Sequence, residues 1–239
     1  MTWKQIFTSS VGKKITMGIT GLFLISFLVI HMGINACIFK DLTVLDPNDN
    51  GDMFNRAADY MGRAVVIRIM ELVLFLGFFV HIIQGLLLEF ENRGRRKINY
   101  AVNLGNRGSK WYSRSMGLLG TILLLFLILH WWHFWIPSRF THAGLENEIV
   151  LSNGRISHDM FNLMKVTFSE WWVVAVYVAA CISLAYHLLH GFQSAFRTLG
   201  LSNSRYISLI NAVGIGYSVL VPLIFALMPI SMKLGWVGY

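Results

Sequence analysis

The chain has 239 residues, of which 55% are apolar and 13% are charged, and it carries a net charge of +8. Soluble domains contain about 25% charged residues, so this composition argues against an ordinary soluble enzyme. A helix needs about 20 apolar residues to cross the hydrocarbon core of a bilayer. Five stretches of about this length or longer contain no Asp, Glu, Lys or Arg: 15–39, 72–88, 115–138, 171–196 and 206–232.

The sequence therefore predicts an all-α integral membrane protein with five transmembrane helices, in which helices I–IV form a bundle and helix V is added. We expect these helices, in chain order, at 15–39, 64–90, 115–137, 168–197 and 206–232. They leave no room for a separate soluble domain, so residues 1–239 are expected to form a single transmembrane domain.

The long loops after helices I and III are rich in Asp, Asn and Gly, and we expect short surface helices in them, such as Asp52–Tyr60. Pro137 is expected to end helix III, because proline cannot continue the backbone hydrogen-bond ladder. For the same reason, Pro222 and Pro229 are expected to kink helix V or to fray its outer end.

Basic residues are distributed unevenly between the loops. Twelve Lys and Arg residues, but only two acidic residues, lie before helix I, between helices II and III, and between helices IV and V. Loops rich in Lys and Arg stay in the cytoplasm. We therefore expect the N-terminus in the cytoplasm and the C-terminus outside. The membrane is expected to be a bacterial-type inner (cytoplasmic) membrane. Topology explains the basic charge, so no nucleic-acid partner is expected.

The chain contains an internal repeat of a helical hairpin. In helices I and III, a Met-Gly-x-x-Gly motif precedes a histidine by the same spacing, in Met17–His31 and Met116–His130. In helices II and IV, a His-x-x-x-Gly motif is followed by a phenylalanine at the same spacing, in His81–Phe90 and His187–Phe196. Helices I–II therefore correspond to helices III–IV.

Six of the eight histidines fall within the predicted spans, where polar side chains are costly and usually functional. The rise of 1.5 Å per residue places His31 and His130 at one level, in the outer half of the membrane. His81 and His187 share a second level, in the inner half and roughly 10 Å away in depth. Each pair can supply the two axial ligands of one haem iron. The alternative is that each histidine only bonds a neighbouring helix backbone.

Two further histidines leave the ligand assignment open. His133 and His190 each lie three residues from a proposed ligand. Either can replace that ligand, or contact a haem propionate or a quinone. Gly85 and Gly191 lie one turn from a histidine and leave room for a haem edge, although close packing of helices is an equal alternative.

These features resemble the di-haem cytochrome b membrane anchor of succinate:menaquinone oxidoreductases and quinol:fumarate reductases. The matching motifs are Lys13-Lys14, His31-x-x-x-Asn35, His81-x-x-x-Gly85, Arg114-x-x-Gly117 and His187-x-x-x-Gly191. The resemblance covers nearly the whole chain and implies four axial histidines, two haems b and a site for menaquinone or another quinone. It also implies that an iron–sulfur subunit, with a flavoprotein subunit beyond it, docks on the cytoplasmic face. The histidine of helix III comes a few residues later than is usual in the family, which leaves His130 and His133 as alternatives.

A quinone site needs groups that exchange protons, and Arg68 and Glu71 are candidates because they lie on one face of the outer part of helix II. A helical ion pair is the alternative. The basic loop from Arg93 to Arg114 is the candidate docking surface for the iron–sulfur subunit, and the alternative is that its charges only set the topology.

Three other functions fit parts of this pattern. A cytochrome b subunit of another quinone-linked dehydrogenase, such as a hydrogenase or formate dehydrogenase, has similar ligands. A di-iron desaturase or hydroxylase has histidine boxes that His130-x-x-His133 and His187-x-x-His190 resemble, but here the two pairs are expected in opposite leaflets. A transporter with histidine proton relays would show no visible absorption.

Overall fold

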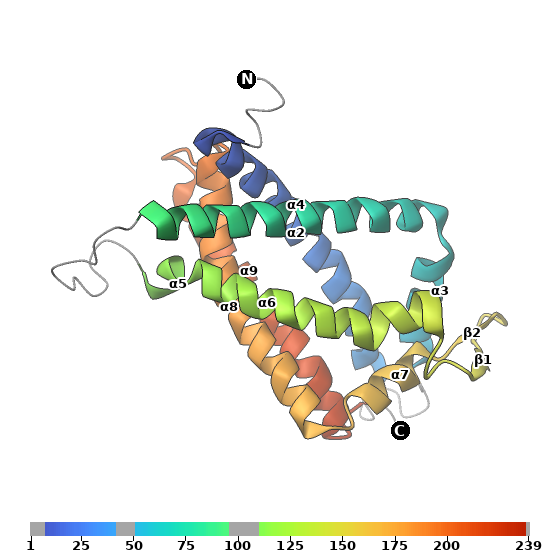
Figure 1. The fold of residues 1–239 in the computed structure, drawn as a ribbon. Coiled ribbons are helices and arrows are strands. Elements are labelled where there is room, and N and C mark those ends of the chain that lie inside the picture. The colour runs from blue at the N-terminus through green and yellow to red at the C-terminus, as the bar shows by residue number, and fades with distance from the viewer. Residues whose placement is uncertain (1–7, 42–50, 96–109, 238–239) are drawn as a thin grey trace. The chain divides into compact units, whose positions relative to one another are not determined.

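The structure is a computed structural model that describes residues 8–41, 51–95 and 110–237 (Figure 1). Its long helices are α2 (Ser10–Asn35), α4 (Val65–Arg95), α6 (Met116–His130), α8 (Trp171–Thr198) and α9 (Ile207–Lys233). With the short turns that extend α2 and α6, these form five helices that are long and apolar enough to span a membrane. The prediction of an all-α membrane protein with five transmembrane helices is confirmed.

The helix ends differ from the prediction where charged residues continue a helix beyond its apolar part. Helix α4 was expected to end at residue 90 but continues to Arg95. Arg93 Nε donates to Glu89 Oε1 over 2.6 Å, one turn earlier in the same helix. Such pairs stabilise a helix in water, so the end of the apolar stretch does not mark the end of the helix.

The prediction that Pro137 ends the third span is wrong. Two wider turns, η2 (Trp131–Trp135) and η3 (Pro137–Thr141), extend α6 through the proline to Thr141. In this region the amide of Ile136 donates to the carbonyl of Trp131, five residues earlier. The shifted hydrogen-bond pattern accommodates a residue that has no amide hydrogen. Helix α9 likewise continues past Pro222 and Pro229, so its outer end is not frayed at these residues.

The loops expected to be polar contain more regular structure than the sequence indicated. The predicted surface helix is α3 (Asp52–Arg63), so this prediction is confirmed. The second loop holds a hairpin that the sequence analysis missed, in which β1 (Glu148–Val150) pairs antiparallel with β2 (Ile156–His158). It also holds α7 (Met160–Thr167), which is capped by the Asp159 side chain accepting from the Asn162 amide over 2.9 Å.

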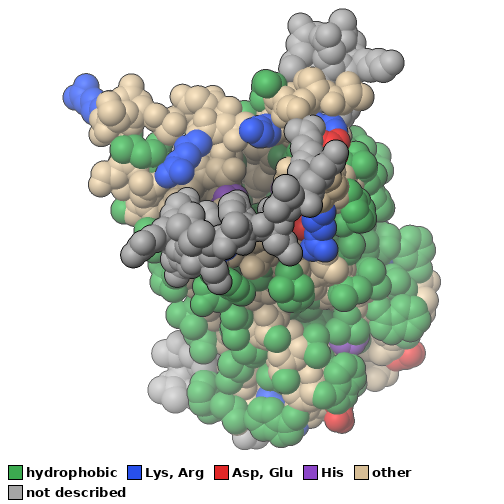
Figure 2. Space-filling view, turned by 60° about the vertical axis from the view of Figure 1, so that its left-hand side comes forward, with side chains coloured by type: hydrophobic (Ala, Val, Ile, Leu, Met, Phe, Trp, Pro, Cys, Tyr) green, Lys and Arg blue, Asp and Glu red, His purple; other side chains and the backbone are tan. Residues whose placement is uncertain are grey.

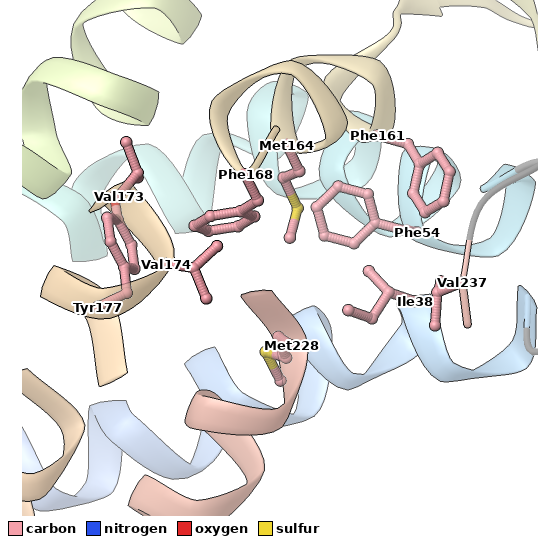
Figure 3. Packing of buried hydrophobic residues seen from close by; sticks show 10 residues of the cluster. All are labelled: Ile38, Phe54, Phe161, Met164, Phe168, Val173, Val174, Tyr177, Met228 and Val237. Carbon is pink, nitrogen blue, oxygen red and sulfur yellow. The ribbon is translucent and has the colours of Figure 1, made fainter. Parts of the chain in front are cut away.

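The chain divides into two compact units. The first consists of Met1–Phe27, Val73–Leu124 and Ser183–Leu220, and the second of Leu28–Leu72, Leu125–Ile182 and Val221–Tyr239. The second unit has an apolar core in which the loop elements pack on helix ends (Figure 3). Its buried members are Ile38, Phe54, Phe161, Met164, Phe168, Val173, Val174, Tyr177, Met228 and Val237.

Apolar side chains are also widely exposed, as expected for a surface that faces lipid. Figure 2 shows them covering broad areas of the surface. On α4, the residues Val65, Leu72 and Leu76 are 73%, 73% and 64% exposed. Contiguous exposed apolar surface of this kind is rare on soluble monomers, and a bilayer would cover it.

Polar contacts hold α3 against the second loop. The fully buried Asn55 donates from Nδ2 to Asp159 Oδ1 over 3.0 Å, and its Oδ1 accepts from the Phe161 amide over 2.9 Å. Asp59 lies between two arginines, with Arg63 Nε at 2.5 Å and Arg155 Nε at 3.4 Å. The loop elements therefore form one connected substructure within the second unit.

Asp59 makes the stability of this substructure depend on pH. Burial raises the pKa of Asp59, but hydrogen bonds from Arg63 and Ser157 and the charges of Arg63 and Arg155 outweigh it and hold the pKa below its usual value. A carboxyl group with a lowered pKa stabilises the fold above its ordinary pKa, and this contribution is lost as pH falls through the folded-state value. Asp59→Asn is expected to be less stable than the unchanged protein at pH 7, with the difference narrowing as pH falls below 4. Thermal unfolding of both proteins in detergent at several pH values checks this. A difference in unfolding temperature that stays constant with pH would contradict the prediction.

Candidate functional site

In the first unit, His81 from α4 and His187 from α8 face each other. Their ring centroids are 6.4 Å apart and their planes are inclined by 65°. A glycine of the Met-Gly-x-x-Gly motif lies beside each ring, since a Cβ on Gly21 would be 3.7 Å from His81 Cε1 and one on Gly120 would be 3.8 Å from His187 Cε1. The contacts of one hairpin therefore repeat in the other, as the sequence repeat predicted.

In the second unit, His31 from α2 and His130 from the end of α6 form a similar pair. Their ring centroids are 5.8 Å apart, with the planes inclined by 87°. Aromatic side chains surround the pair: Phe225 lies 5.6 Å from the ring of His31, and Phe126 stacks on His130 at 5.7 Å. The structure thus brings together the two histidine pairs that the spacing along the helices predicted.

The other two histidines of the spans have different surroundings. His133 stacks on Tyr177, with ring centroids 5.8 Å apart, and its Nδ1 lies 3.0 Å from the tyrosine hydroxyl. His190 is only partly buried. Asn35, from the His31-x-x-x-Asn35 motif, donates to the His31 carbonyl over 2.8 Å. The ring of His130 faces His31, whereas the ring of His133 contacts Tyr177, so these contacts favour His130 over His133 as the partner of His31.

The paired histidines fit the axial positions of a haem. A metal ion bound by one nitrogen of each imidazole at about 2 Å would place the two ring centroids about 6 Å apart. The observed separations of 5.8 and 6.4 Å agree with this distance. The buried Nδ1 atoms of His130 and His187 have no hydrogen-bond partner in the described part of the chain, so no described protein group holds either ring through this atom. Two imidazoles suffice for a haem iron, because the porphyrin supplies the remaining ligands.

The surroundings of the two motif glycines differ. A Cβ on Gly85 would lie 3.7 Å from Met17 Cε, an ordinary contact. A Cβ on Gly191 would meet no described atom within 4 Å. Close helix packing therefore does not explain glycine at position 191, and the space beside it remains available to a planar ligand.

The quinone candidates Arg68 and Glu71 belong to an ion-pair network in the second unit, which also includes Arg139. Glu71 accepts hydrogen bonds from Trp135 Nε1 and from Arg139, whose Nε and terminal nitrogen lie at 3.2 and 3.1 Å. Arg68 is farther away, at 3.8 Å, and its side chain is 52% exposed. Sequence reasoning missed Trp135 and Arg139, because no local pattern indicates a contact between residues more than sixty positions apart.

This arrangement predicts a structural role for Glu71. Replacing Glu71 with Gln is expected to destabilise the protein by about 1–3 kcal/mol, because Arg139 would lose its charged partner. Arg68→Gln should have little effect, because exposed ion pairs contribute little. Thermal unfolding of both variants in detergent checks the prediction. An unchanged unfolding temperature for Glu71→Gln together with a raised KM for quinol would instead support a quinone site.

The candidate docking loop lies largely outside the described residues, which omit 96–109. At its edges, Arg114 lies in the short helix α5 (Trp111–Arg114). In the Lys13-Lys14 motif, Lys13 has a structural role, because its buried side chain forms an ion pair with Glu91 that joins α2 to α4.

No known protein family, curated protein or solved structure matches the chain.

Proposed function

We propose that this chain is the membrane anchor and electron-transfer subunit of a succinate:quinone oxidoreductase. The observation that carries the proposal is the presence of two histidine pairs, each with the ring separation of a bis-imidazole haem site. In each pair, one histidine belongs to the first helical hairpin and the other belongs to the second. His81 and His187 would hold one haem b, and His31 and His130 the other. The haems, when bound, supply one-electron carriers.

The residues around the pairs determine the environment of the ligands. Phe126, Phe225 and Tyr177 enclose the His31–His130 pair in apolar surface, which limits access of water. Thr20, Gly21 and Gly120 lie against the other pair. The chain does no carbon chemistry in this proposal, and its role is to hold the carriers, tune them and keep water away from them.

The partners follow from the same proposal. An iron–sulfur subunit with a flavoprotein subunit docks on the basic, cytoplasmic side of a bacterial-type inner membrane, and menaquinone or another quinone is the membrane substrate. The N-terminus lies in the cytoplasm and the C-terminus outside. This arrangement serves succinate oxidation and fumarate reduction equally.

The test is a dithionite-reduced minus oxidised spectrum of the purified chain, with a pyridine haemochrome measurement of haem per chain. We expect two haems b per chain. A well-folded preparation without haem would overturn the proposal. Identification of the proteins that copurify from a native membrane then decides the complex, because a hydrogenase or formate dehydrogenase partner would contradict the succinate assignment.

A further inference from the structure

One of the two histidines in the first unit has a hydrogen-bond partner that the other lacks. The hydroxyl oxygen of Thr20, on α2, lies 3.0 Å from Nδ1 of His81. The same hydroxyl donates to the carbonyl of Thr16 over 2.8 Å. By contrast, the buried Nδ1 of His187 has no partner among the described residues.

The direction of the Thr20–His81 hydrogen bond depends on where the single hydrogen of the threonine hydroxyl points. The Thr16 carbonyl, at 2.8 Å, is a nearer acceptor than Nδ1 of His81, at 3.0 Å, and the hydroxyl hydrogen is assigned to it. With this assignment the hydroxyl oxygen accepts from His81, and His81 carries its hydrogen on Nδ1. Its Nε2 is therefore an unprotonated nitrogen with a lone pair, which is the form that binds a metal.

We propose that Thr20 is a positioning residue that fixes the orientation and the protonated nitrogen of His81 and makes His81 the stronger electron donor of the His81–His187 pair. This inference rests on the proposed function, because it takes His81 to be an axial ligand. A hydrogen bond from the distal nitrogen of a ligating histidine to an acceptor orients the ring and increases its basicity. A more basic ligand stabilises ferric iron over ferrous iron, so Thr20 lowers the reduction potential of this haem.

The repeat shows that this feature belongs to one hairpin only. Aligning Met17 with Met116 places Thr20 opposite Leu119, whose side chain has no group that accepts a hydrogen bond. The glycines that follow, Gly21 and Gly120, keep equivalent contacts with His81 and His187. The two hairpins thus share their shape around the histidines but differ in the polarity of this one position.

The experiment is a redox titration of the haem spectrum in Thr20→Val and in the unchanged chain. The midpoint potential of one haem is expected to rise, while that of the other stays constant and serves as an internal standard. At a fixed applied potential, the ratio of reduced to oxidised form of the affected haem should rise about tenfold. For a one-electron couple this corresponds to a rise of about 59 mV in the midpoint potential.

Two control variants separate positioning from a general effect of the substitution. Thr20→Ser retains a hydroxyl and is expected to keep the original potential. Thr121→Val removes a threonine that donates to the Gly117 carbonyl over 2.8 Å on an exposed face of α6, and it should change neither potential.

Several outcomes would overturn the inference. Unchanged potentials in Thr20→Val with two haems bound would show that the hydroxyl does not tune His81. Equal shifts in Thr20→Val and Thr20→Ser would show that only the side-chain shape matters. If the unchanged chain binds no haem, the proposed function itself fails, and that result is distinguishable because it does not involve Thr20. Should Thr20→Val not retain its haem, Thr20→Ser and Thr20→Cys provide the comparison, since sulfur is a weak acceptor.

Discussion

Replacing His81 or His187 with alanine is expected to reduce the haem content from about two to about one per chain. The same loss is expected for His31 or His130, but from the other site. In the proposed function each ring supplies one of the two ligands of a haem, and the ring centroids of the two pairs are 6.4 and 5.8 Å apart, so one replacement would leave a single axial ligand. The retained haem is expected to keep its spectrum, because its own two histidines are unchanged. Pyridine haemochrome measurements on the four variants check this.

His133→Ala is the matched control for His130→Ala, because both residues lie on the same extended helix. It removes the contact with Tyr177, and we expect it to keep two haems. If His133→Ala loses one haem and His130→Ala keeps both, the ligand assignment in the second unit is reversed. Loss of both haems in every variant would indicate a collapse of the fold rather than loss of a ligand.

Gly51→Ala is expected to destabilise the second unit by about 2–5 kcal/mol, from left-handed strain together with overpacking. Gly51 precedes α3 with φ at +80°, a conformation that side chains with a Cβ rarely adopt. A Cβ at this position would also lie 2.2 Å from Cγ of Phe161, a core residue that is 3% exposed. With alanine at this position, either the Phe161 ring or the first turn of α3 must move. Thermal unfolding or protease resistance in detergent measures the loss.

Gly154→Ala separates the two causes. Gly154 has nearly the same φ, +79°, but a Cβ there would meet no described atom within 4 Å. It should therefore show only the backbone strain, about 1–2 kcal/mol. Equal losses in Gly51→Ala and Gly154→Ala would mean that the contact with Phe161 relaxes without cost.

The five spans were predictable because a bilayer imposes a minimum apolar length that few other structures need. Their ends were less predictable, because helices continue where charge pairs such as Glu89–Arg93 or wider turns such as Pro137–Thr141 support them. The hairpin in the second loop was missed because its strands have three residues each, too few to show an alternating pattern.

The histidine pairs could be predicted from the repeat, because equal spacing along helices that cross the membrane in the same direction places residues at equal levels. The repeat also prefers His130 over His133, because His31 has no second histidine three residues later. The contact of His133 with Tyr177 supports this preference, and no local sequence signal marks that contact. Thr20 was also missed, although its place opposite Leu119 in the repeat was visible. The partners of Glu71 depend on tertiary contacts alone.

Each histidine pair takes one ring from the first hairpin and one from the second, and this has a consequence for biogenesis. When α2 and α4 have been synthesised and inserted, the nascent chain contains one ligand for each proposed site and a complete pair for neither. The His31–His130 pair can form only after α6 is made, and the His81–His187 pair only after α8 is made. A cofactor delivered during translation would therefore find no finished site, and its capture would join the two halves of the chain as a late step of assembly.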